Sequence, residues 1–206
     1  HIHSPLGGQG LNLGLGDAMN LGWKLAATID GSAPDGLLDT YHIERHPVGA
    51  QVLDWSRAQV AIMRPDPHAK ALHAIMRELM ATRDGTTAIA GRVWGVTNQY
   101  DLGGAHPLIG RSAPNFAFDD GSSLAAAMHD GRALLLDFHG NPALAALSER
   151  YAGRIHYIAR PAVDTCRLSA LLVRPDGCVA WATDGAPDLP AIELALATWM
   201  RLTIAQ

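Results

Sequence analysis

The residues best suited to chemistry stand at the start of the chain, in the run His1-Ile-His-Ser-Pro-Leu-Gly-Gly-Gln-Gly. Gly7, Gly8 and Gly10 carry no Cβ, so the backbone here can approach a flat or anionic ligand closely. A helical pattern follows at once, and the free N–H groups of a helix start form an anion site at the positive end of the helix dipole. From spacing alone, an ordinary turn is the more common explanation of such a loop.

Two other pairs of residues could bind metal or do thiol chemistry. His42 and His46 are one helical turn apart, a spacing that two zinc ligands can use, but no third ligand follows at a recognisable interval. Ordinary surface histidines are the favoured interpretation. Cys166 and Cys178 form neither a CxxC pair nor a disulfide framework, which suits a reducing cytoplasm. We interpret both as structural residues rather than as a redox pair.

A helix is predicted directly after the loop, ending near Asp30-Gly31. Apolar residues recur there at spacings of three and four and predict one broad apolar face: Leu11, Leu15, Met19, Trp23 and Ala26. Asp17, Asn20 and Lys24 share another side of the same helix. That polar side is either a solvated face or a seam against missing chain.

The remaining sequence divides into a helical stretch and a mixed one. Helices are predicted over residues 37–62, with an interruption or kink at Pro47, and over residues 67–83 and 87–96. From His106-Pro107 onward, β-prone and helical runs alternate. Strands are predicted over residues 115–118, 133–139, 155–159, 168–174 and 179–182, and helices over 124–128, 142–151 and 189–202. Pro175-Asp176-Gly177 predicts a hairpin turn, so the pattern favours a small α/β domain with a mixed sheet.

Composition narrows the functional classes. The 206 residues are 48% hydrophobic and 17% charged, a globular balance that allows one large domain or two small ones. The net charge is −4 and the basic residues are scattered, which argues against nucleic acid as a partner. The longest apolar runs fall far short of the roughly 20 residues that cross a bilayer. The opening has no secretory pattern and begins with His1, so we expect a cytoplasmic protein whose start is a cut.

The first 26 residues resemble the second flavin motif of class A flavoprotein monooxygenases. In that motif a Gly-Asp pair precedes a fixed order of residues, which here is His1, Pro5, Gly8-Gln9-Gly10, Leu11-Asn12, Asp17-Ala18 and then Asn20 to Leu25. Residues 38–48 resemble the helix that comes next in the same family. The length and order of the match make this resemblance specific.

Residues from His106 onward resemble the thioredoxin-like C-terminal domain of phenol hydroxylases and aromatic polyketide hydroxylases. The resemblance rests on residues 106–114, Asp120-Gly121 and residues 171–181. Where a working thioredoxin has its two cysteines, this chain has His139-Gly140-Asn141-Pro142. The implied fold class is α/β: the helical C-terminal part of a p-hydroxybenzoate-hydroxylase-like FAD domain over residues 1–104, then a thioredoxin-like domain lacking CxxC over residues 105–206.

The family resemblance implies an FAD- and NADPH-dependent monooxygenase that hydroxylates an aromatic polyketide or another phenolic substrate through a flavin hydroperoxide. The cofactor-binding residues that it implies are Pro5, Gly8, Gln9, Gly10, Leu11 and Asn12, with the N–H groups near Leu11 and Asn12 facing the pyrimidine edge of the isoalloxazine. No catalytic side chain is expected, because the flavin carries the chemistry. The Gly-Asp pair would lie just before His1, and the sequence has no GxGxxG. We therefore expect the chain to depend on an N-terminal FAD-binding segment and to be inactive alone.

Two alternatives stand beside this hypothesis. The chain could be a non-catalytic assembly or docking module, left by truncation and without FAD binding of its own. A thiol oxidoreductase is disfavoured by the absent CxxC. The expected partners are an aromatic small molecule and the FAD-binding segment, with neither nucleic acid nor membrane, and a homo-oligomer is compatible with the composition.

Overall fold

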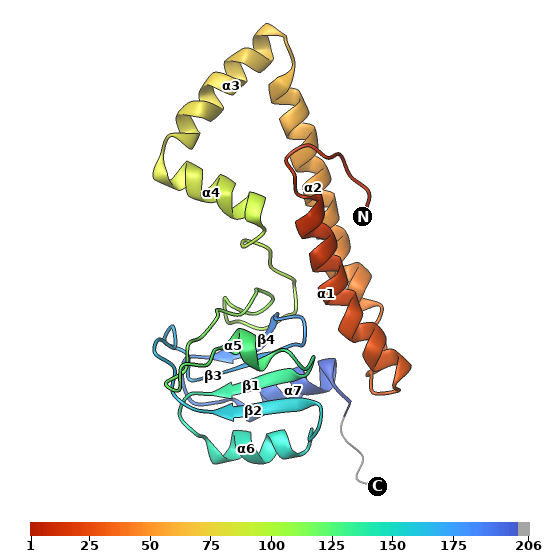
Figure 1. The fold of residues 1–206 in the computed structure, drawn as a ribbon, viewed down its shortest axis with the longest axis vertical. Helices are drawn as coiled ribbons and strands as arrows, with labels where there is room; N and C mark the ends of the chain where they lie inside the picture. The colour runs from red at the N-terminus through yellow and green to blue at the C-terminus, as the bar shows by residue number, and fades with distance from the viewer. Residues whose placement is uncertain (202–206) are drawn as a thin grey trace. The chain divides into compact units, whose positions relative to one another are not determined.

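The structure is a computed structural model that describes residues 1–201, and it combines helices with one four-stranded sheet (Figure 1). The helices are α1 (Gly10–Ile29), α2 (Thr40–Met63), α3 (Pro67–Met80), α4 (Arg83–Trp94), α5 (Leu124–Ala127), α6 (Pro142–Glu149) and α7 (Leu189–Trp199). The strands are β1 (Ala133–Asp137), β2 (Ile155–Ala159), β3 (Ala170–Val173) and β4 (Val179–Thr183). The predicted end of the last helix at Leu202 lies outside the described residues.

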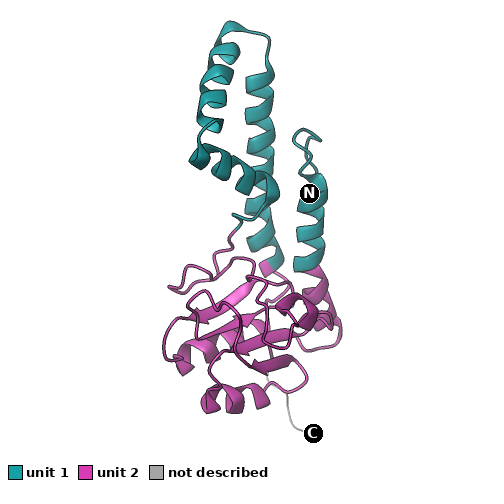
Figure 2. Cartoon of the chain, turned by 60° about the vertical axis from the view of Figure 1, so that its left-hand side comes forward, with its two compact units in different colours: residues 1–20, 41–98 teal, residues 21–40, 99–206 magenta. Residues whose placement is uncertain are grey.

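The chain forms two compact units, coloured separately in Figure 2. The helical unit comprises residues 1–20 and 41–98, and the sheet unit comprises residues 21–40 and 99–206. The division falls inside α1, so each unit contains one half of that helix. A domain boundary near residue 104 stays a prediction.

Side-chain caps set the ends of the helices in the helical unit. The carboxylate of Asp66 accepts the Ala69 N–H at 2.9 Å and starts α3 at Pro67, where proline is well tolerated. The Thr82 hydroxyl accepts the Gly85 N–H at 3.1 Å and starts α4 at Arg83. This cap explains why the break falls at residues 81–82, earlier than the sequence pattern predicted.

Helix α2 runs unbroken through Pro47, so the predicted interruption does not occur. Proline removes the N–H that would bond the carbonyl of Ile43 one turn earlier. Both residues lie on the exposed side of the helix, where water can satisfy that carbonyl. The helix therefore tolerates the proline.

In the first half of α1 the apolar face is the exposed one. Leu11, Leu15 and Met19 are 75%, 55% and 57% exposed. The polar side is the buried one, because α2 presents charged partners to it: the Asn20 amide donates to the Glu44 carboxylate at 2.6 Å. The polar side is therefore neither a solvated face nor a seam against missing chain, because it packs on α2 of this same chain.

The sheet unit contains a mixed sheet with the strand order β2-β1-β3-β4. Strand β1, helix α6 and β2 form a parallel crossover, and β3 and β4 then form an antiparallel hairpin beside β1. Helix α7 closes the unit. The predicted α/β class with a mixed sheet is confirmed, in the topology that the thioredoxin-like resemblance implied.

Apolar side chains cover both faces of this sheet. One cluster joins alternate strand residues to α6, α7 and Leu37, and includes Leu135, Leu144, Leu172, Ile192 and Leu196. The other joins the opposite strand residues to the segment before β1, and includes Phe116, Phe118, Leu134, Leu136 and Leu171. All five residues of β1 are consequently buried, which explains its continuous apolar run.

Two predicted strands change at their ends or vanish. Residues 115–118 form only isolated bridges, because Phe116 and Phe118 point into the core without a neighbouring strand along their length. Strand β1 ends at Asp137 rather than at residue 139. The buried Asp137 carboxylate accepts the N–H groups of His139, Gly140 and Asn141 at 3.1, 2.9 and 2.5 Å, which turns the chain away from the sheet.

Candidate functional site

The glycine-rich loop lies at the start of α1 as a tight turn. Gly7 and Gly8 have φ values of 83° and 66°, which glycine adopts without strain. The Gly8 N–H donates to the Pro5 carbonyl at 3.2 Å. The first bond of the helix runs from the Leu13 N–H to the Gln9 carbonyl at 3.0 Å. The N–H groups of residues 10–12 therefore precede the helical ladder and have no acceptor within it.

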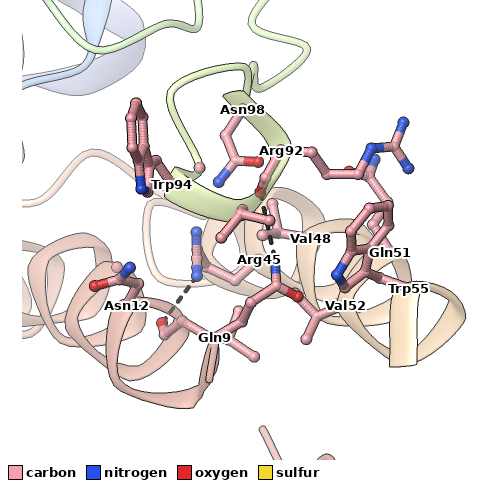
Figure 3. Close-up of a pocket in the computed structure, with 14 residues that line it drawn as sticks. Gln9, Asn12, Arg45, Val48, Gln51, Val52, Trp55, Arg92, Trp94 and Asn98 are labelled. Carbon is pink, nitrogen blue, oxygen red and sulfur yellow. Dashed lines mark hydrogen bonds between the residues drawn. The ribbon is translucent and has the colours of Figure 1, made fainter. Parts of the chain in front are cut away.

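The six residues predicted to bind the cofactor divide by exposure. Those with exposed positions are Pro5, Gly8, Leu11 and Asn12, and Gly10 is half-buried. Gln9 is buried, and its Nε2 donates to the carbonyl of Arg92 at 3.3 Å (Figure 3). Gln9 thus anchors the loop to the end of α4, a contact that the sequence did not indicate.

Gly10 has a close neighbour within the loop itself. A Cβ placed on Gly10 would lie 2.9 Å from both Cε1 and Nε2 of His3. The imidazole of His3 is held from its other nitrogen, since Nδ1 lies 2.7 Å from the Ser4 carbonyl. A side chain at position 10 would therefore have to move His3 before it could touch any ligand.

Arg45 of α2 holds the first half of α1 in place. Its Nε donates to Asp17 at 2.7 Å, and its Nη2 donates to the carbonyl of Leu13 at 3.1 Å. His1 contacts the other oxygen of the same Asp17 carboxylate at 2.8 Å. A Cβ on Gly16 would approach Nη2 of Arg45 to 2.9 Å, so this glycine makes room for the guanidinium. These contacts between α1 and α2 fix the direction in which the start of α1 points.

A cavity of about 160 Å³ lies behind the loop, between α1, α2 and the end of α4 (Figure 3). Its labelled lining residues are Gln9, Asn12, Arg45, Val48, Gln51, Val52, Trp55, Arg92, Trp94 and Asn98. The Oε1 of Gln9 and the Nε1 of Trp55 are buried there without a protein partner among the described residues. Sequence reasoning missed this cavity because its walls come from three separate helices.

The structure shows where the two candidate residue pairs for metal binding and thiol chemistry lie. The rings of His42 and His46 lie 4.9 Å apart, centroid to centroid, on α2. Within residues 1–201 no group of three or more His, Cys, Asp or Glu side chains is arranged to hold a metal ion. Cys166 is exposed, Cys178 is buried, and neither forms a disulfide. Among the same residues, no helix is long and apolar enough to span a bilayer.

Chemically, the loop offers donors rather than acids or bases. Backbone N–H groups stand at the positive end of a 20-residue helix, beside exposed glycine backbone. Such an arrangement suits a flat group whose edge carries acceptor oxygens or nitrogens or gains negative charge.

Comparison with known proteins shows which families the two parts of the chain resemble. Residues 1–56 match a family described as an FAD binding domain, and residues 106–201 match one described as the C-terminal part of aromatic-ring hydroxylases. A monooxygenase from Claviceps purpurea is 48% identical over 98% of this chain and 40% of its own length. A rifampicin monooxygenase from Streptomyces venezuelae is 43% identical over 92% of this chain and 38% of its own length.

A solved structure agrees with both the fold and the sequence. The anhydrotetracycline hydroxylase from Streptomyces rimosus superposes with a TM-score of 0.91 at 40% identity, covering 97% of this chain and 42% of that one. Together, the two matched families and the solved structure with the same fold identify the class as flavin-dependent aromatic hydroxylases. The chain corresponds to a fragment of a class A FAD-dependent aromatic hydroxylase. It spans about 40% of the length of the curated relatives that it matches.

Proposed function

We propose that this chain is part of an FAD- and NADPH-dependent monooxygenase that hydroxylates an aromatic polyketide or another phenolic molecule. The observation that carries the proposal is the start of α1, where unbonded N–H groups stand behind a glycine-rich loop. The named activities of the relatives support the substrate class, since they include a rifampicin monooxygenase and an anhydrotetracycline hydroxylase.

The loop residues suit the flavin ring by their chemistry. The N–H groups of Leu11 and Asn12 would face acceptors on the pyrimidine edge, and the helix dipole would stabilise negative charge there. Gly8 would allow close approach, because nothing lies within 4 Å of a Cβ built on it. Gln9 would hold the loop through its bond to Arg92. FAD, when bound, accepts a hydride from NADPH and transfers oxygen from dioxygen to an aromatic ring.

The rest of such an enzyme must supply the other contacts to FAD and the substrate. The exposed face of Leu11, Leu15 and Met19 begins at the flavin loop. Single exposed apolar residues need no explanation, but three in register on one helix face favour a packing surface. We propose that the N-terminal FAD-binding segment packs here.

A non-catalytic docking module is the second candidate. The observation that favours it is the loop at residues 139–142, where the Asp137 carboxylate organises the backbone in place of a thiol pair. The sheet unit on this hypothesis serves assembly, and the helical unit holds no FAD in any context.

Removal of one backbone donor separates the two candidates. In a protein that joins this chain to an FAD-binding segment, Leu11→Pro deletes the N–H, and proline is tolerated in the first turn of a helix. Leu11→Ala is the matched control, because it removes the same exposed side chain and keeps the N–H. We expect Leu11→Pro to slow reduction by NADPH about a hundredfold relative to Leu11→Ala, or to release FAD that Leu11→Ala retains. Equal rates in both variants, with FAD retained, would favour the docking module.

A further inference from the structure

A second cavity lies in the sheet unit and is lined by arginine and tryptophan side chains. It encloses about 180 Å³ and is lined by the last turns of α1, the turns before β1 and β2, the β3–β4 hairpin and the end of α7. The residues that line it include Trp23, Asp30, Arg132, Arg154, Trp199 and Met200. None of them belongs to the flavin loop or to the cavity behind it.

The hydrogen-bond donors of this cavity are left without acceptors. The indole Nε1 of Trp23 and the guanidinium Nε of Arg154 are buried and have no partner among the described residues. Buried donors of this kind normally find an acceptor, because leaving them unpaired costs free energy. Two such donors in the lining of one cavity favour an acceptor supplied from outside the described structure.

Two hydrogen-bond acceptors at the same cavity, the Ala27 carbonyl and the Asp30 carboxylate, already have donors. The carbonyl of Ala27 accepts the N–H groups of Ser32 and Ala33 at 2.8 and 2.9 Å. The Asp30 carboxylate accepts the same Ser32 N–H at 2.8 Å, and hydrogen bonding from Ser32 holds the pKa of Asp30 below its usual value. These two acceptors therefore have donors within the chain, whereas the buried indole and guanidinium donors have no acceptor among the described residues.

The charges of the lining favour an anion. Arg132 and Arg154 stand against the single carboxylate of Asp30. Arg132 already forms an ion pair with Asp130 at 2.5 Å. Arg154 forms no ion pair or side-chain hydrogen bond within residues 1–201, although its Nε is buried. Besides hydrogen bonding from Ser32, the charge of Arg154 helps to lower the pKa of Asp30. No carboxylate among the described residues contacts the Arg154 guanidinium, so a bound anion would offset the cost of burying that charge.

The walls of the cavity suit a flat molecule. Two indole side chains, Trp23 and Trp199, line it together with Pro175 and Met200. Aromatic walls bind planar apolar groups by stacking, and a cavity of this size holds a single ring. We propose that this cavity binds a small aromatic carboxylate, with the carboxylate on Arg154 and the indole N–H of Trp23, and the ring against Trp199. The proposal does not depend on flavin binding.

Benzoate and benzyl alcohol form a matched pair of probes, since they share a ring and differ in charge. Binding to the purified chain is followed by the shift of the Trp23 indole N–H resonance, assigned with a Trp23→Phe variant. We expect saturable benzoate binding with a Kd of about 1 mM and no comparable binding of benzyl alcohol. Arg154→Met should raise the Kd for benzoate at least about tenfold.

Two control variants distinguish loss of the binding site from loss of the folded structure. Arg150→Met removes an exposed arginine that pairs with Glu193 outside the cavity, and we expect it to leave benzoate binding unchanged. Arg154→Lys keeps the charge without the Nε donor, so its affinity should fall between wild type and Arg154→Met, and it serves if Arg154→Met does not fold. Equal binding of benzyl alcohol, unchanged binding in the folded Arg154 variants, or no benzoate binding at all would each overturn the proposal.

Discussion

A substitution at Gly10 could impair flavin binding in two ways, by displacing His3 or by obstructing the flavin ring. A side chain there meets His3 at 2.9 Å, and on the proposed function it would also approach the flavin ring. A tip of a flexible side chain can move away at low cost, whereas a bound ring cannot. The two causes therefore respond differently to removal of His3.

We expect Gly10→Ala, in a protein that also carries the FAD-binding segment, to slow flavin reduction about a hundredfold or to release FAD. Adding His3→Ala should not restore the rate, because the flavin contact is still obstructed. The measurement is stopped-flow reduction by NADPH with FAD content checked, and His3→Ala alone is the control. Full recovery in the double variant would show that Gly10 serves only the packing of His3.

Tyr157 provides a second test at the residue scale. Its hydroxyl donates to the buried Asp137 carboxylate at 2.8 Å, the same carboxylate that organises the loop after β1. Tyr157→Phe should lower the free energy of unfolding by about 2 kcal/mol at neutral pH, as expected for a bond to a charged acceptor. Urea unfolding measures this, and Tyr151→Phe is the control. A loss below about 0.5 kcal/mol would mean that water replaces the hydroxyl.

The same residue predicts a dependence on alkaline pH. Burial, followed by the hydrogen bond to Asp137, raises the pKa of Tyr157 above its ordinary value of about 10. The unfolded chain therefore loses this proton first as pH rises, so the stabilisation is complete below pH ~10 and decreases above it. Urea unfolding in steps across that range should show a smaller decrease for Tyr157→Phe than for wild type. Identical pH profiles would contradict the assignment.

At the scale of elements, the β3–β4 hairpin depends on a buried ion pair. Arg174 is fully buried and donates to Asp176 within the turn, at 3.1 Å from Nε and 2.5 Å from Nη2. Rings of Trp199, Trp23 and Tyr100 surround its guanidinium at 4.4, 5.4 and 5.8 Å. The hairpin turn was predicted from Pro175-Asp176-Gly177, but its role as the centre of this cluster was not.

We expect Asp176→Asn to destabilise the chain by about 3 kcal/mol, because it leaves a buried guanidinium without its countercharge. Asp184→Asn is the matched control: its carboxylate is exposed and faces His106 at 3.2 Å, so its loss should cost under about 1 kcal/mol. Both are measured by urea unfolding. Equal, small losses would show that the Asp176 charge is not what stabilises Arg174, and would favour the surrounding aromatic rings.

At the scale of the whole molecule, the proposed function gives the helical unit one part of an FAD site. The loop contributes backbone donors, and no GxGxxG is present in the sequence. We therefore expect the 206-residue chain alone to bind FAD with a Kd above about 10 µM, or not at all. Calorimetric titration tests this directly, and a submicromolar Kd would contradict it.

The division into units yields a test of independent folding. We expect residues 105–206 to unfold cooperatively on their own, as the change of pattern near residues 102–107 indicates. The sheet unit also includes Leu37, 2% exposed in the core, so the isolated piece should be less stable by about 2 kcal/mol or more. Urea unfolding compares the piece with the whole chain. Absence of a cooperative transition would contradict the predicted boundary.

The resemblance carried by the sequence identified the family, and the sequence pattern alone predicted the α/β class, the hairpin turn and most helix ends. These depend on local chemistry: glycines that permit an unusual backbone, proline and Asp at a turn, and apolar runs long enough for a buried strand. Tertiary structure decided which side of α1 is buried. Its pattern predicted an apolar face with Leu11, Leu15 and Met19 but not which face is buried; α2 presents Glu44 and Arg45, and those charges pair with the polar side. It also decided that Gln9 anchors the loop and that two arginines and two tryptophans surround one cavity in the sheet unit. Periodicity describes one element at a time, whereas burial depends on the charge and shape of the neighbour that an element meets.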